Sequence, residues 1–227
     1  MGSNPLTAKP SAYKPCQQCG ERPADSVAGI LCAVCFRKSL FEAAPEEAKR
    51  HEWSVVVPER FMCACVADLP PKIAAAFQCE NDVGIYLWGP PGVGKTYALC
   101  AAAKEFIKNG YRCNRTSYEL LCLHLRDTFK PSSKQSEWDI IKPLVESDRL
   151  FIEDVGTTKS IDNAESDFSL RTLLVLLDIR MEHCRPTYIT TNKSVENLAA
   201  SFDARIGDRL RLYQIIKLEG ESRRKRI

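Results

Sequence analysis

Short apolar runs alternate along the chain with longer segments whose apolar residues recur at helical spacing. The mostly apolar run 83–88 leads into a Gly/Pro-rich loop and predicts a buried strand. The alanine-rich segment 97–108 predicts a helix that ends at Asn109-Gly110. The pattern continues with strands expected at 111–115, 149–153, 186–190 and 213–218, and helices at 118–128, 138–145, 165–184, 194–200 (capped by Ser194) and 204–210.

Strands that alternate with helices indicate βαβ units, so we expect an α/β fold with a parallel sheet flanked by helices. Before this region, residues 1–14 are rich in Pro, Ser, Ala and Lys, 37–50 predicts a short helix and linker, and 72–77 predicts another helix. We therefore divide the chain into an N-terminal module with its linker, residues 1–50, and a main domain, residues 51–227.

Composition narrows the class of protein. The 227 residues are 44% apolar, enough for a core, and carry a net charge of only +3. No run of eighteen apolar residues predicts a membrane span, and the first residues lack a signal-peptide pattern, so we expect a cytoplasmic protein. Four basic residues gather in 222–227, which is typical of a solvated end and less often of a phosphate contact.

Four of the eleven cysteines form two C-x-x-C pairs: Cys16 with Cys19, and Cys32 with Cys35. Each pair can present two thiolates from one tight turn, and two such turns complete a tetrahedral Zn²⁺ site. So short a segment cannot bury a core of its own, so a metal would supply its stability. Four protein ligands leave no open position, which predicts a structural and not a catalytic zinc.

The run 89–96 matches G-x-x-x-x-G-K-[ST], with a predicted strand before it and a predicted helix after it. That context is the one a phosphate-binding loop requires, because backbone N–H groups and the helix N-terminus surround the phosphates. Lys95 would reach the β- and γ-phosphates, and the Thr96 hydroxyl would ligate Mg²⁺. The residues expected to bind nucleotide here are Gly89, Pro90, Pro91, Gly92, Val93, Gly94, Lys95, Thr96 and Tyr97.

Two further strands end in groups suited to phosphate chemistry. Glu153-Asp154 follows an apolar run, where such enzymes place the Mg²⁺-linked acid and the carboxylate that polarises water. Asn192 follows the next strand and can orient the attacking water or contact the γ-phosphate. Asn192-Lys193-Ser194-Val195 has Val where a guanine-reading motif needs Asp, so the sequence favours ATP over GTP.

Taken together, these motifs resemble the AAA+ ATPases of the DnaC/DnaI helicase-loader and IstB group, from about residue 57 to 224. The resemblance covers Pro58-Glu59-Arg60-Phe61, the loop 89–96, Glu153-Asp154-Val155-Gly156, the strand 186–192, the segment 204–210 and Gly220-Glu221-Ser222-Arg223-Arg224. It implies a P-loop AAA+ core preceded by a small Cys₄ zinc module.

The resemblance also implies roles for particular residues. Glu153 would take the Mg²⁺ position and Asp154 the water-activating position. The family usually has Asp-Asp or Asp-Glu here, so in this chain the longer acid would hold the metal and the shorter one would have to reach the water. Arg209, with Arg205 second, would serve as an arginine finger in a neighbouring subunit. Arg224 would take a sensor-2-like role, although Arg223 stands where the family usually has Tyr.

The resemblance leaves three functions open. The first is an ATPase that oligomerises with ATP and loads a DnaB-type replicative helicase onto single-stranded DNA. The second is an IstB-like helper of a transposase, and the third is a helicase adaptor that hydrolyses ATP slowly. The expected cofactors are ATP, Mg²⁺ and Zn²⁺. Candidate DNA contacts lie on the second strand–helix unit: Arg115, Ser117, Tyr118, Arg126, Lys130 and Lys134.

Overall fold

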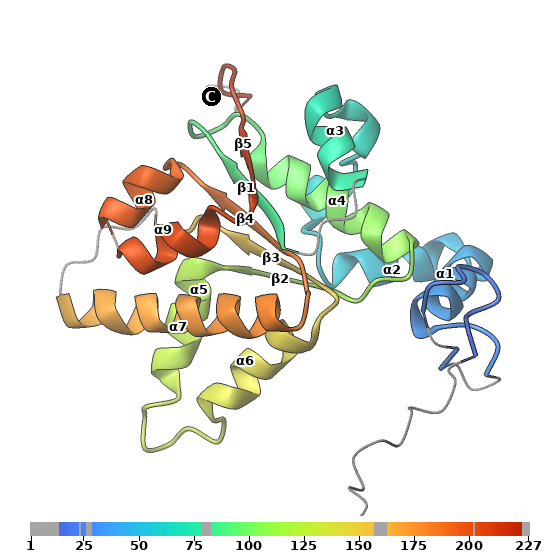
Figure 1. The fold of residues 1–227 in the computed structure, drawn as a ribbon, viewed down its shortest axis with the longest axis horizontal. Helices are drawn as coiled ribbons and strands as arrows, with labels where there is room; N and C mark the ends of the chain where they lie inside the picture. The colour runs from blue at the N-terminus through green and yellow to red at the C-terminus, as the bar shows by residue number, and fades with distance from the viewer. Residues whose placement is uncertain are drawn as a thin grey trace, which may run out of the picture.

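A computed structural model describes residues 14–22, 24–25, 29–78, 83–156, 163–201 and 203–223. Its centre is a five-stranded sheet in the order β2-β3-β4-β1-β5, in which every neighbouring pair is parallel (Figure 1). The strands are β1 (Gly84–Trp88), β2 (Cys113–Ser117), β3 (Arg149–Glu153), β4 (Thr187–Thr191) and β5 (Gln214–Lys217). The expected α/β fold with a parallel sheet is confirmed.

Helices cover both faces of the sheet, as a parallel sheet requires. One layer contains α4 (Lys95–Lys108) with α3 (Pro71–Gln78), α2 (Glu46–Ser54) and α1 (Ala33–Ala43). The opposite layer contains α5 (Tyr118–Asp127), α6 (Glu137–Glu146), α7 (Asn163–Glu182), α8 (Val195–Ser201) and α9 (Ala204–Leu210). Two short 3₁₀ turns, Glu59–Phe61 and Val66–Asp68, connect α2 to α3.

Successive residues of the central strands enter different cores, because side chains alternate across a sheet. Ile85 and Leu87 of β1 pack with α4, whereas Tyr86 packs with the helices of the opposite layer. Phe151 of β3 likewise stacks on Tyr188 of β4 in the α4 core, with ring centroids 5.0 Å apart. The sheet therefore forms a rigid base for the loops at its edges.

The predicted elements of the main domain are present, with most boundaries within one or two residues. The predicted strand 111–115 was displaced: β2 begins only at Cys113. Tyr111 still belongs to the turn after α4, since its N–H donates to Phe106 O, and the N–H of Arg112 donates to Asp148. The predicted loop 156–164 lies largely outside the described residues.

The short helix and linker expected at 37–50 are only partly present, because a second helix occupies much of the expected linker. The structure has two helices, α1 and α2, separated at Ala44 and Pro45. Ala44 is extended (φ −71°, ψ 148°), as residues before proline prefer, and Pro45 then provides the N-cap of α2. Because α2 runs from 46 to 54, it crosses the proposed division at residue 51, which stays a prediction.

The N-terminal module packs against the amino ends of β2 and β3. The Arg37 guanidinium donates to Gly110 O (2.6 Å) and to the Asp148 carboxylate (2.8 Å), and Arg22 donates to the Tyr111 hydroxyl (3.0 Å). At Gly110, which has φ +85°, a Cβ would lie 2.1 Å from Val34 O. Only glycine allows α1 to approach the end of α4 this closely.

None of the described helices combines the length and apolar character that a membrane span needs.

Candidate nucleotide cavity and cysteine cluster

The strand order brings the predicted catalytic residues to one edge of the sheet. The phosphate-binding loop (residues 89–96) follows β1, Asn192 follows β4, and Asp154 follows β3, and these three strands are neighbours. Because parallel strands end at the same edge, all three groups meet there. The β3 and β4 ends are tied together, since the Thr191 hydroxyl donates to Val155 O (2.6 Å).

A cavity of about 430 Å³ opens at this edge, in the size range of ligand pockets. It contains most of the phosphate-binding loop and groups from four other parts of the chain. The lining residues are Arg60, Phe61, Pro91, Gly92, Gly94, Lys95, Thr96, Tyr97, Asp154, Asn192 and Arg223. Three of these side chains are cationic and only Asp154 is a carboxylate, so the cavity favours an anionic ligand.

Lys95 is positioned by acceptors on both sides of the cavity. Its Nζ donates to Gly89 O and Pro90 O, each at 2.8 Å, and to the Asn192 side-chain oxygen at 2.7 Å. Lys95 is only 7% exposed, yet it opens α4 directly beneath the cavity. The Lys95 ammonium therefore links the phosphate-binding loop to Asn192 at the end of β4.

The two acids of the pair Glu153-Asp154 face different surroundings. Asp154 is exposed, lines the cavity and has φ +55°, a left-handed conformation that is uncommon outside glycine. Its N–H donates to the Thr190 hydroxyl at 3.4 Å, which holds the turn against β4. This turn directs the Asp154 carboxylate toward the phosphate-binding loop.

Glu153 instead forms a bidentate ion pair with Arg115 of β2. The two nitrogen–oxygen distances are 2.8 Å and 3.1 Å, and Glu153 is 5% exposed. Burial alone would lower the pKa of Arg115, but the hydrogen bonds and charge of Glu153 outweigh it and raise that pKa. Arg115 was expected to contact DNA, and the structure gives it this different task.

The other candidate DNA contacts divide into two groups. Tyr118 is 6% exposed and packs in the core, which removes it from the candidates. The Ser117 hydroxyl accepts the Leu120 N–H and caps α5, as its position predicted. Arg126 is partly exposed and Lys130 and Lys134 are exposed, with Lys130 paired to Asp127 (2.6 Å), so these three stay candidates for contact with a phosphate backbone.

The C-terminal segment contributes a cavity residue that sequence reasoning did not select. The Arg223 N–H donates to Gly92 O (2.9 Å), and Arg223 lines the cavity. Arg224, which the resemblance favoured, lies outside the described residues. The sequence signal that could have pointed to Arg223 was the arginine itself, which stands where the family usually has Tyr.

Arg209 of α9 forms a bidentate ion pair with Asp178 of α7, at 2.6 Å and 2.9 Å. The charge and hydrogen bonds of Asp178 raise the pKa of this guanidinium. Arg205 pairs with Asp203, the N-cap residue of its own helix. The finger role of Arg209 stays a prediction, and it would require Arg209 to exchange Asp178 for a phosphate.

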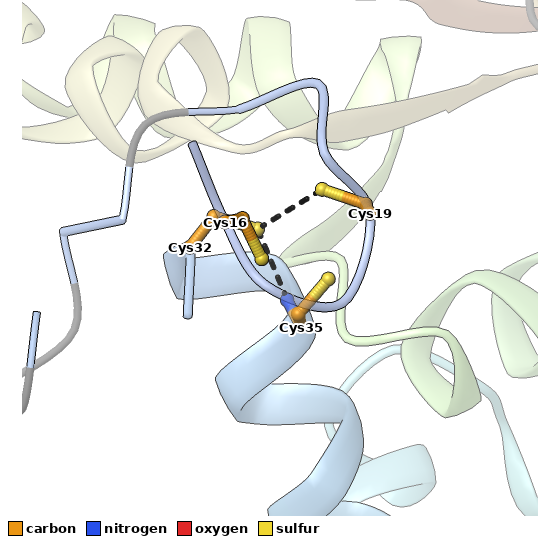
Figure 2. Close-up of side chains that lie close together, drawn as sticks. All are labelled: Cys16, Cys19, Cys32 and Cys35. Atoms are coloured by element: carbon orange, nitrogen blue, oxygen red, sulfur yellow. Dashed lines mark hydrogen bonds between the residues drawn. The ribbon is translucent and has the colours of Figure 1, made fainter. Parts of the chain in front are cut away.

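At the other end of the molecule, the four paired cysteines converge on one point (Figure 2). Their sulfur atoms all lie within 4.8 Å of one another, and Cys19 Sγ lies 4.0 Å from Cys32 Sγ. Sulfurs around a tetrahedral Zn²⁺ lie about 3.8 Å apart, given Zn–S bonds of about 2.3 Å. The donor set and its spacing therefore fit zinc.

The local fold explains this convergence. Cys16 and Cys19 occupy one tight turn, in which Gly20 N donates to Cys16 O (2.8 Å). Cys32 is the N-cap of α1, and its sulfur accepts the Cys35 N–H. Burial raises the pKa of the Cys16 thiol, but backbone N–H donors from Cys19 and Cys32 outweigh it and lower that pKa to about 6, whereas burial and the neighbouring thiols raise the pKa of Cys35 to about 12. A thiolate is the form that binds zinc.

The comparison with protein families identifies the main domain. The model of the IstB-like ATP binding protein family matches residues 67–227, most of this chain. The chain belongs to this family. The match starts just before α3 and includes the phosphate-binding loop, β3, β4 and the C-terminal segment, so the cavity lies almost entirely within it.

Two helicase loaders are similar in sequence. The replicative helicase loader DnaC of Escherichia coli K12 is 27% identical over 134 residues, which is 59% of this chain and 52% of DnaC. The replicative helicase loader DnaI of Bacillus subtilis is 27% identical over 154 residues, which is 62% of this chain and 47% of DnaI. The chain thus spans about half the length of the curated relatives it matches.

Solved structures show the same fold. A crystal structure of DnaI has a TM-score of 0.60 and 23% identity, covering 77% of this chain and 100% of that chain. A crystal structure of the DnaC helicase loader has a TM-score of 0.58 and 18% identity, covering 71% of this chain and 99% of that chain. Together with the family match, these findings confirm the predicted resemblance and the AAA+ type of core.

Proposed function

We propose that this protein is an ATPase that loads a replicative helicase onto single-stranded DNA. The observation that carries this proposal is the cationic cavity built by the phosphate-binding loop, Asn192 and Asp154, in a family of ATP-binding proteins. The similarity to DnaC and DnaI, whose names describe helicase loaders, supports the choice of partner. Hydrolysis, the DNA and assembly into a homo-oligomer are parts of the proposal.

In this proposal, Lys95 binds the β- and γ-phosphates after giving up its contacts with Gly89 O and Pro90 O. Asp154 orients and deprotonates the attacking water, and Asn192 holds that water or the γ-phosphate. The Thr96 hydroxyl would hold Mg²⁺, and the Glu153 carboxylate would join it by exchanging Arg115 for the metal when nucleotide binds; the metal would neutralise charge on the phosphates. Both are oxygen donors of the kind Mg²⁺ prefers.

The cysteine cluster would hold Zn²⁺ through Cys16, Cys19, Cys32 and Cys35 as a structural metal. The zinc would fix the head of α1, whose exposed side includes Phe36 and Leu40, at 38% and 56% exposure. We expect the helicase to contact this module.

A slowly hydrolysing adaptor is the second candidate, and the Arg115–Glu153 ion pair favours it. Glu153 cannot serve a metal while both of its oxygens accept bonds from Arg115. Nucleotide would then bind readily but turn over slowly. A variant that removes the guanidinium, Arg115→Met, separates the two candidates: under the adaptor reading it raises ATP turnover, and under the loader reading it leaves turnover equal or lower.

The proposal is tested by mixing the protein with the replicative helicase of its host and measuring complex size with ATP. Leu40→Glu changes the exposed side of α1, and Leu212→Glu, at an exposed leucine that follows α9, is its matched control. We expect a complex with the wild type and the control, and a weaker one with Leu40→Glu. If no variant forms a complex, the helicase assignment is wrong, and a transposase with duplex DNA becomes the partner to test.

A further inference from the structure

Residues 218–223 follow β5 and run along one side of the phosphate-binding loop. The Leu218 N–H donates to Trp88 O (2.7 Å), immediately before that loop begins. Five residues later, the Arg223 N–H donates to Gly92 O (2.9 Å). Two backbone hydrogen bonds therefore fasten this segment beside the loop, near the end of the chain visible above β5 in Figure 1.

The C-terminal segment approaches Gly92 so closely that this position has no room for a side chain. A Cβ at Gly92 would lie 2.1 Å from Ser222 Oγ. The next glycine of the loop faces the neighbouring side chain, since a Cβ at Gly94 would lie 3.7 Å from Arg223 Cδ and 3.9 Å from its Cζ. The Arg223 side chain therefore lies against Gly94 of the loop, from its Cδ to the guanidinium carbon.

The position of Arg223 beside the phosphate-binding loop suits its guanidinium to bind phosphate. Arg223 lines the same cavity as Lys95 and Thr96, the two residues that a phosphate-binding loop uses for phosphate and metal. Within the part of the chain that the structure describes, the Arg223 guanidinium forms no ion pair with a carboxylate. A planar guanidinium with five N–H donors matches the oxygens of a phosphate group.

We infer that Arg223 is a nucleotide-binding residue that contacts the phosphates of ATP, and that residues 218–223 form one side of the nucleotide site. This inference rests on the proposed function, because it needs the cavity to bind a nucleotide. Arg224 is the residue for which the resemblance suggests a phosphate role, and the family's usual Tyr at position 223 has no charge to offer.

Equilibrium titrations with ATP and ADP in the presence of Mg²⁺ test the inference on the full chain. The variants are Arg223→Ala, Arg223→Lys and Arg223→Tyr, with Arg211→Ala as the matched control. Arg211 is an exposed arginine at the C-cap of α9 and does not line the cavity. Thermal unfolding of each variant shows whether the fold is intact.

We expect Arg223→Ala and Arg223→Tyr to weaken ATP binding about 10-fold, the usual worth of one charge-assisted hydrogen bond. Arg223→Lys should recover part of this loss, and Arg211→Ala should bind like the wild type. A greater loss for ATP than for ADP would place the guanidinium at the γ-phosphate, and an equal loss would place it at the phosphates common to both.

Two results would overturn the inference without touching the proposed function. In the first, wild type and Arg223→Ala bind ATP equally. In the second, binding falls only in proportion to a lowered unfolding midpoint and Lys restores nothing, which would mean a structural role. Failure of the wild type to bind ATP would instead overturn the proposed function, and this inference with it.

Discussion

The two ends of the parallel sheet differ in how their positive charges are neutralised. At the carboxyl ends, Lys95 and Arg223 face a cavity with a single carboxylate among its lining residues. At the amino ends, Arg37 and Arg112 both pair with Asp148 in a packed contact. The first arrangement leaves positive charge for a ligand to neutralise, and the second neutralises it within the chain. We therefore expect changes at the first end to alter binding and changes at the second to alter stability.

Removing Zn²⁺ from the cysteine cluster should have the largest effect of these changes, and the quantity that it changes is the stability of the fold. Chelation is expected to lower the unfolding free energy by about 4 kcal/mol and the midpoint by roughly 10 °C, because the cysteine turns have little core of their own. Thermal unfolding with and without chelator measures this. Cys184→Ser, at an exposed cysteine outside the cluster, should respond to chelator as the wild type does. A chelator-insensitive midpoint would contradict the zinc assignment.

Lys95→Ala should weaken ATP binding on the order of 100-fold, because it removes the ammonium that the phosphate-binding loop presents to the phosphates. A fluorescent nucleotide titration measures the affinity. The matched control is Lys108→Ala, at the exposed end of the same helix, where the lysine pairs only loosely with Glu105 (3.6 Å). Wild-type affinity in Lys95→Ala would break the assignment of the carboxyl end as the nucleotide site.

Gly110→Ala should lower the unfolding free energy by about 2–3 kcal/mol while leaving ATP affinity unchanged. The added Cβ would lie 2.1 Å from Val34 O and 2.7 Å from Lys38 N, and both are backbone atoms that cannot rotate away. The left-handed conformation adds to the cost. Chemical denaturation and nucleotide titration together check this pair of outcomes, and an intact stability would mean that α1 does not pack there in solution.

Asp148→Asn should have the smallest effect, about 1–2 kcal/mol of stability, because it leaves Arg37 and Arg112 without their shared carboxylate. Burial would raise the pKa of Asp148, but Arg112 and Arg37 outweigh it and lower that pKa. A lowered pKa stabilises the fold above pH about 4, and the benefit is lost as pH falls below that value. Denaturation curves at pH 7 and pH 3 should therefore differ most between variant and wild type at pH 7.

The sequence was sufficient to predict the parts whose signals are local. Hydrophobic periodicity located the strands and helices of the main domain, and the loop 89–96 and both C-x-x-C pairs followed from spacing alone. Asn192 could be assigned because it ends a strand, and parallel strands bring their ends together.

Contacts between distant segments could not be predicted in this way. Nothing near Arg115 in the sequence indicates that Glu153, 38 residues later, accepts both of its hydrogen bonds. The docking of α1 on Gly110 and the place of Arg223 beside Gly92 likewise depend on how the strands are ordered. Two local signals were misread: the helix start after Pro45 and the start of β2 at Cys113.

Helix α4 joins the two ends of the sheet, with Lys95 at its first residue and Gly110 just beyond its last turn. Its fourteen residues make a rod about 21 Å long, and α1 with its cysteine cluster is seated on the far end of that rod. The N-terminal module is therefore packed on the end of α4 in a fixed position. The cysteine cluster and the nucleotide cavity are thus held at a set distance and orientation from each other, so a contact made at one end of α4 has a fixed position relative to the other end.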